Sequence, residues 1–129
     1  MSEIRIVAIK NGKIINIFRW TGHIRRSGPM RQSPRVYWFT GLSGAGKTTL
    51  CRRLSIYRRR QGRPVVMLDG DELREIMGAT TAHGREERLQ LAMRYAHLCH
   101  MIAEQGFDVA IATISLFREV HEWNRKNLT

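Results

Sequence analysis

One glycine-rich segment constrains the fold of this chain more than any other part of the sequence. It reads GLSGAGKT over residues 41–48 and matches the phosphate-binding loop pattern G-x-x-x-x-G-K-[ST]. A short, continuous apolar run precedes it at residues 36–40, as expected for a buried strand. A helical pattern opens directly on Lys47. Because the complete motif lies between a strand and a helix, it predicts a site for nucleotide phosphates.

The chemistry of phosphate binding explains these residue types. Glycines let the backbone wrap around a phosphate so that several N–H groups converge on it, and the start of the helix adds its partial positive charge. Lys47 would supply a formal charge to the β- and γ-phosphates, and the Thr48 hydroxyl is placed for Mg²⁺. The predicted ATP-binding residues are consecutive: Gly41, Leu42, Ser43, Gly44, Ala45, Gly46, Lys47, Thr48 and Thr49.

Two carboxylates follow the second predicted strand, at residues 65–68. Asp69 and Asp71 come directly after it, where ligands collect in open α/β sheets. We assign Mg²⁺ to Asp69 and the role of proton acceptor for an incoming hydroxyl to Asp71, although the sequence alone does not separate these roles. The alternative is that Asp-Gly-Asp is only a turn that caps the next helix. The third strand ends without an acidic residue that would compete for the metal.

The order of the predicted elements indicates the fold class. Strands and helices alternate over residues 36–40, 47–60, 65–68, 86–105 and 109–113. This alternation predicts an α/β protein with a parallel sheet and right-handed crossovers, and the phosphate loop makes it a three-layer P-loop NTPase fold. In the first helix, Leu50, Leu54 and Tyr57 share one face and arginines occupy the other.

The first part of the chain has a different composition. Residues 1–34 are predicted to form a basic extension: two β-rich runs around Asn11-Gly12, which suits a hairpin turn, and then a loop or linker rich in Gly, Pro and Arg. The P-loop domain is predicted to occupy residues 35–129.

Charge and composition limit the cellular context. The formal net charge is +11, and residues 1–63 hold 15 basic residues against one acidic residue. This excess favours a polyanionic partner, which would be nucleic acid, an acidic membrane surface or a phosphorylated small molecule; a general preference for Arg is the alternative. No apolar run approaches the ~18 residues of a membrane span, and the N-terminus does not resemble a secretory signal. We expect a cytoplasmic protein with no membrane contact.

Four motifs together resemble the adenylylsulfate kinase family: GLSGAGKTTL at 41–50, LDGDELR at 68–74, REER at 85–88 and ISLFR at 114–118. The resemblance runs from about residue 36 to residue 125. It implies a kinase that transfers the γ-phosphate of MgATP to the ribose 3′-hydroxyl of adenosine 5′-phosphosulfate. By position, Asp71 and Lys47 would be catalytic. The substrate-binding positions would be Arg74, His83, Arg88, Leu91, Ile114 and Ser115.

The departures from the family pattern fall on the acceptor side. Leu116 replaces a proline and His121 an arginine; counted without gaps from Arg88, Leu91 replaces an asparagine and His83 a phenylalanine that stacks on adenine. This pattern resembles a divergent branch found among capsule-polysaccharide genes, which includes kinases of cytidine diphosphoramidate. A nucleotide-linked acceptor other than adenylylsulfate is therefore the rival hypothesis.

Compared with the family, the chain is short. We expect it to be incomplete at its C-terminus, without the last strands and the lid that close over both nucleotides. One edge of the central strand would then lack a neighbour, and the N-terminal hairpin or a second copy in a homodimer could cover it. A non-catalytic nucleotide-binding or nucleic-acid-binding fragment is the third hypothesis, although nucleic acid is the less favoured partner.

Overall fold

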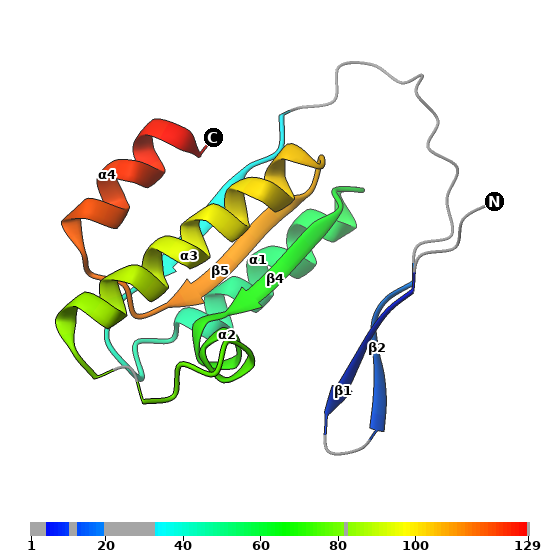
Figure 1. The fold of residues 1–129 in the computed structure, drawn as a ribbon. Helices are drawn as coiled ribbons and strands as arrows, with labels where there is room; N and C mark the ends of the chain where they lie inside the picture. The colour runs from blue at the N-terminus through cyan, green and yellow to red at the C-terminus, as the bar shows by residue number, and fades with distance from the viewer. Residues whose placement is uncertain (1–4, 11–12, 20–32, 82, 129) are drawn as a thin grey trace. The chain divides into compact units, whose positions relative to one another are not determined.

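The computed structural model describes residues 5–10, 13–19, 33–81 and 83–128, and it divides the chain into two units, Met1–Arg31 and Gln32–Thr129. In the first unit, β1 (Arg5–Lys10) pairs antiparallel with β2 (Lys13–Arg19) (Figure 1). Two paired strands thus lie where the sequence favours a hairpin. The proposed turn at Asn11-Gly12 and the linker at 20–32 lie outside the described residues.

The second unit holds the predicted α/β alternation. Its elements are β3 (Val36–Thr40), α1 (Lys47–Arg60), β4 (Val65–Asp69), α2 (Gly70–Ile76), α3 (Arg85–Glu104), β5 (Asp108–Thr113) and α4 (Arg118–Asn127). The three strands are parallel, in the order β3-β5-β4. The α/β class, the parallel sheet and the positions of the three strands and two long helices are confirmed. Sequence reasoning did not define α2 and α4.

Helices cover both faces of this sheet, with α3 on one face and α1 on the other (Figure 1). Successive side chains of a strand point to opposite faces. In β5, accordingly, Val109 and Ile111 pack in the cluster with α3, and Ala110 and Ala112 pack in the cluster with α1. All six residues of β5 are buried. Helix α4 packs on α3 in a third cluster, which contains Val120.

Two expectations about the sheet, one on burial and one on strand pairing, are wrong. Residues 36–40 were expected to be buried on both faces, but every residue of β3 is only partly buried, because β3 has one strand neighbour in the described sheet. The expected unpaired edge of the central strand is not found: β5 is central and paired on both sides, and the open edges of the described sheet belong to β3 and β4.

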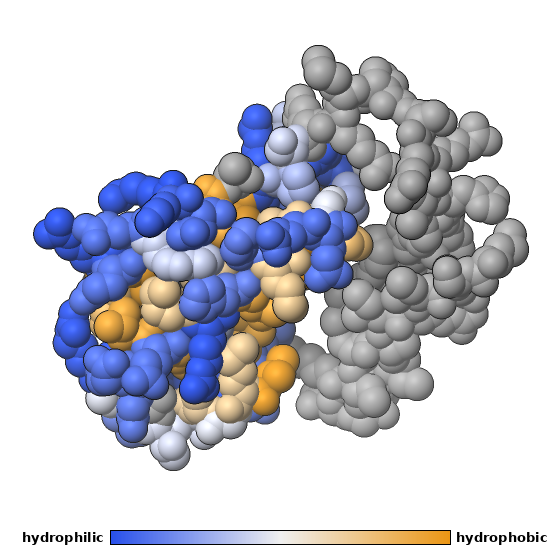
Figure 2. Space-filling model, turned by 45° about the horizontal axis from the view of Figure 1, so that its top comes forward, coloured by the Kyte–Doolittle hydropathy of each residue, from blue (hydrophilic) through white to orange (hydrophobic). Residues whose placement is uncertain are grey.

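The apolar face of α1 does not pack on the sheet. Leu50 is 54% exposed and Tyr57 is 58% exposed, and the buried residues of the helix are Cys51 and Ser55. Small side chains let α1 lie close to the alanines of β5, and the Ser55 hydroxyl is satisfied by the carbonyl of Cys51 at 2.8 Å. Figure 2 shows hydrophilic side chains over much of one face of this unit, with smaller hydrophobic areas between them.

A charged cluster anchors the start of β5. Asp108 is fully buried and accepts hydrogen bonds from the backbone N–H of Arg35 (3.1 Å) and from the guanidinium groups of Arg58 (3.1 Å) and Arg63 (2.6 Å). Burial by itself would raise the pKa of Asp108, but the hydrogen bonds from these arginines lower it below its ordinary value.

In the described part of the chain, no helix combines the length and the apolar character that crossing a membrane requires.

Candidate functional site

The predicted phosphate loop joins β3 to α1 through three glycines with positive φ: Gly41 (153°), Gly44 (76°) and Gly46 (81°). At Gly44 and Gly46 this left-handed conformation would strain any other residue. Helix α1 begins at Lys47 without a side-chain cap and has no acidic residue in its first turn. Its positive end is therefore presented to the space above the loop.

A cavity of about 330 Å³ lies over this loop. Its lining residues are Ser43, Gly44, Gly46, Lys47, Thr48, Thr49, Asp69, Asp71, Ala112, Thr113 and Ile114. The structure thus brings six of the predicted ATP-binding residues together with both aspartates. Gly41, Leu42 and Ala45 shape the loop and are not among the lining residues; the Leu42 carbonyl accepts hydrogen bonds from Ala45 N–H (3.3 Å) and Lys47 Nζ (2.6 Å).

The two predicted metal ligands lie in contact. Thr48 Oγ1 donates a hydrogen bond to Asp69 Oδ2 at 2.9 Å. The other carboxylate oxygen of Asp69 accepts the backbone N–H of Asp71 at 2.9 Å and so caps α2. The metal hypothesis and the capping alternative therefore involve different oxygens of one side chain. Hydroxyl and carboxylate oxygens are hard donors, which is the ligand type that Mg²⁺ prefers.

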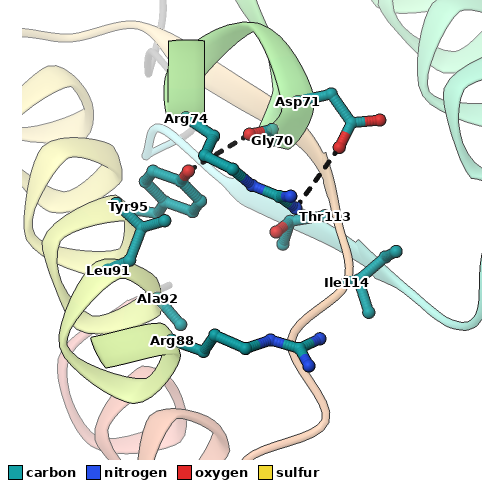
Figure 3. A pocket seen from close by; sticks show the side chains of 9 residues that line it. All are labelled: Gly70, Asp71, Arg74, Arg88, Leu91, Ala92, Tyr95, Thr113 and Ile114. Atoms are coloured by element: carbon teal, nitrogen blue, oxygen red, sulfur yellow. Dashed lines mark hydrogen bonds and ion pairs between the residues drawn. The ribbon is translucent and has the colours of Figure 1, made fainter. Parts of the chain in front are cut away.

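A second, narrower pocket adjoins this cavity (Figure 3). It is lined by Gly70, Asp71, Arg74, Arg88, Leu91, Ala92, Tyr95, Thr113 and Ile114. Asp71, Thr113 and Ile114 line both spaces. The Asp71 carboxylate lies 3.5 Å from the guanidinium of Arg74. One exposed carboxylate thus stands where the loop cavity meets a pocket with two arginines.

Four of the six predicted acceptor-side residues meet in this second pocket: Arg74, Arg88, Leu91 and Ile114. The other two do not line it. His83 is exposed. Ser115 is fully buried, and its carbonyl accepts hydrogen bonds from Thr40 Oγ1 at 2.8 Å and from His121 Nε2 at 2.7 Å. Ser115 therefore does not line the pocket; it joins the loop after β5 to the end of β3.

Sequence reasoning missed three contributors. Thr113 lines both spaces, and its place at the carboxyl end of a parallel strand could have indicated it. Gly70 has no room for a side chain, because a Cβ there would lie 2.7 Å from Thr113 Oγ1. Tyr95 lines the second pocket and donates its hydroxyl to the Gly70 carbonyl at 3.1 Å. Burial raises the pKa of Tyr95, so the hydroxyl stays a neutral donor.

A glycine-rich loop between a strand and a helix, at the carboxyl edge of a parallel sheet, defines a P-loop nucleotide-binding protein. The family model described as "Adenylylsulphate kinase" matches residues 33–129. The chain belongs to the adenylylsulphate kinase family, which confirms the resemblance noted in its motifs.

Individual relatives agree with this assignment. The chain is 39% identical over 99 residues to a cytidine diphosphoramidate kinase of Campylobacter jejuni, covering 77% of this chain and 58% of the relative. It is 42% identical over 91 residues to an adenylyl-sulfate kinase of Chloroflexus aurantiacus, covering 70% and 49%. The chain thus spans about half the length of these curated relatives.

Solved structures agree as well. The structure of the Mycobacterium tuberculosis APS kinase CysC in complex with AMPPNP and APS matches with a TM-score of 0.67 and 29% identity, over 74% of this chain and 56% of that one. A hexameric APS kinase from Thiobacillus denitrificans matches with a TM-score of 0.60 and 31% identity, over 73% and 20%. These likenesses confirm the P-loop kinase fold.

Proposed function

We propose that this protein transfers the γ-phosphate of MgATP to a hydroxyl of a nucleotide that carries a further anionic group. The observation that carries the proposal is the position of Asp71, which lines both the cavity over the phosphate loop and the pocket with two arginines. A carboxylate at the junction of donor and acceptor spaces is suited to accept the proton of an attacking hydroxyl.

The remaining residues have separate roles in this proposal. The loop N–H groups and Lys47 hold the β- and γ-phosphates, and Thr48 and Asp69 hold Mg²⁺, which neutralises charge on the phosphate oxygens when bound. Arg74 and Arg88 attract the anionic group of the acceptor. The groups thereby orient two anions for an in-line transfer and stabilise the charge of its transition state.

Adenosine 5′-phosphosulfate, phosphorylated at its 3′-hydroxyl in sulfate assimilation, is the first acceptor we propose. The family and the two arginines support it. Cytidine diphosphoramidate, or a similar nucleotide of capsule synthesis, is the second. Its support is the relative in Campylobacter jejuni together with Leu91, an apolar, buried residue in the wall of the acceptor pocket. ATP as donor and two free cysteines, both buried, fit a cytoplasmic location.

Phosphorus NMR with MgATP and each acceptor in turn tests the proposal. We expect one acceptor to gain a phosphomonoester signal. Lys47→Ala should abolish nucleotide binding, whereas Asp71→Asn should keep it and slow turnover by about 10²- to 10⁴-fold. Glu72→Gln, which removes a neighbouring exposed charge, is the matched control and should leave turnover unchanged. Binding of MgATP without turnover of either acceptor would refute the acceptor assignment, and absence of magnesium-dependent binding would refute the whole proposal.

A further inference from the structure

Tyr95 is a buried polar side chain to which the proposed transfer gives no role. It lies on α3, is 3% exposed, and forms part of the wall of the acceptor pocket. Its ring packs in the core cluster with Leu91 and Cys99. Its hydroxyl leaves this apolar cluster and donates to the carbonyl of Gly70 on α2 at 3.1 Å (Figure 3).

The contacted carbonyl belongs to the residue between the two aspartates of the site. Gly70 is buried and is the first residue of α2. A Cβ on it would lie 2.7 Å from Thr113 Oγ1 and 2.9 Å from Thr113 Cβ, so β5 packs directly against its α-carbon. The start of α2 is therefore held from two sides, by Thr113 at the α-carbon and by Tyr95 at the carbonyl.

We infer that Tyr95 is a positioning residue, whose hydroxyl fixes the Gly70 peptide and thereby holds the Asp71 carboxylate at the junction of the two pockets. Asp71 is itself exposed, and among the residues that the structure describes only Arg74, at 3.5 Å, contacts its carboxylate through a side chain. Its place thus depends on the backbone that carries it. The effect on catalysis rests on the proposed function. The positioning of Asp71 rests only on the hydrogen bond between Tyr95 and the Gly70 carbonyl.

Tyr95→Phe isolates the hydroxyl, because phenylalanine fills the same space in the core. We expect kcat to fall about fivefold to tenfold, as for the loss of one hydrogen bond that matters in the transition state. The KM for ATP should not change, since Tyr95 does not line the cavity over the loop. Tyr57→Phe, at a tyrosine that is 58% exposed on α1, is the matched control and should leave kcat unchanged.

A double-mutant cycle distinguishes positioning from a general loss of structure. If Tyr95 acts through Asp71, Tyr95→Phe should have no further effect on kcat in the Asp71→Asn background. If the two effects multiply, the hydroxyl acts by another route and the inference is wrong.

Amide hydrogen exchange gives a readout that needs no turnover. The Asp71 N–H is bonded to Asp69 Oδ1, and we expect its exchange to be faster in Tyr95→Phe than in wild type and unchanged in Tyr57→Phe. If the wild type phosphorylates neither acceptor, the proposed function fails, and the exchange rate alone decides whether Tyr95 positions Asp71. Unchanged exchange in Tyr95→Phe would overturn the inference, whatever the kinetics.

Discussion

Replacement of Asp108 by asparagine should destabilise this protein strongly without altering the residues of its candidate site. The carboxylate is fully buried at the start of β5, and its partners Arg58 and Arg63 have side chains only 12% and 16% exposed. It accepts bonds from both arginines and from one backbone N–H, at 2.6 to 3.2 Å. Asparagine would keep one acceptor oxygen, but it would remove the negative charge from the cluster and turn an NH₂ donor toward the guanidinium groups.

Removing one partner of a buried ion pair costs about 3–5 kcal/mol. The arginines retain some contact with solvent, so we expect a value near the lower end, about 3 kcal/mol. This loss is a substantial fraction of a total stability of about 5–15 kcal/mol. Urea denaturation followed by tryptophan fluorescence would measure it as a lower midpoint with an unchanged slope.

Glu119→Gln is the control, because the Glu119–Arg85 pair has a similar separation, 3.0 Å, but both side chains are largely exposed. No measurable shift of the midpoint is expected there. A loss below about 1 kcal/mol for Asp108→Asn would refute the reasoning, because it would mean that water screens the cluster as it does a surface pair.

The same cluster predicts a pH dependence. The pKa of Asp108 lies below its ordinary value of 3.8 in the folded chain. A carboxylate with a depressed folded-state pKa contributes stability that is fully present above the unfolded-state pKa and is lost as the pH falls through the folded-state pKa. The difference in unfolding free energy between wild type and Asp108→Asn should therefore be constant near neutral pH and shrink below about pH 4. A difference that stays constant down to about pH 2 would contradict this assignment.

Three further experiments test other features of the fold. Gly70→Ala should lower the free energy of unfolding by about 1–3 kcal/mol, because the backbone must move away from β5; Gly84→Ala, where an added Cβ meets its nearest neighbour at 3.6 Å, should not. His121→Leu should lower the free energy of unfolding, measured by urea denaturation, by about 1 kcal/mol, because the Ser115 carbonyl would lose one of its two donors and keep only Thr40; His121→Gln should restore part of this loss. Burial raises the pKa of Cys51 to about 11 and that of Cys99 to about 12, so at about pH 8 both thiols should react with a disulfide reagent only after denaturation.

Local patterns account for the geometry of the glycine-rich loop. Positive φ angles at Gly44 and Gly46 and a helix that begins at Lys47 follow from residues adjacent in the chain. Thr48 lies in the first turn of α1 and Asp69 is the last residue of β4, and the hydrogen bond between them forms at the carboxyl edge of the sheet. Periodicity gave the bounds of α1 but not its buried face: it groups apolar residues such as Leu50 and does not say which face meets the sheet. Close approach to the alanines of β5 favours small side chains there instead.

The second pocket depends on pairs of residues that no local pattern connects. Tyr95 is 25 residues from Gly70, and Thr40 is 75 residues from Ser115. Strand register brings such residues together: Thr40 pairs with Thr113 across β3 and β5, and Asp69 pairs with the residue before Thr113 across β4 and β5. One sheet edge thus collects the end of β3, Asp69 with its partner Thr48, and the wall of the second pocket. The sequence predicted that edge from three strand ends. It could not predict the contact of Tyr95 with the Gly70 carbonyl, because only the packing of α3 on the sheet brings the two residues together.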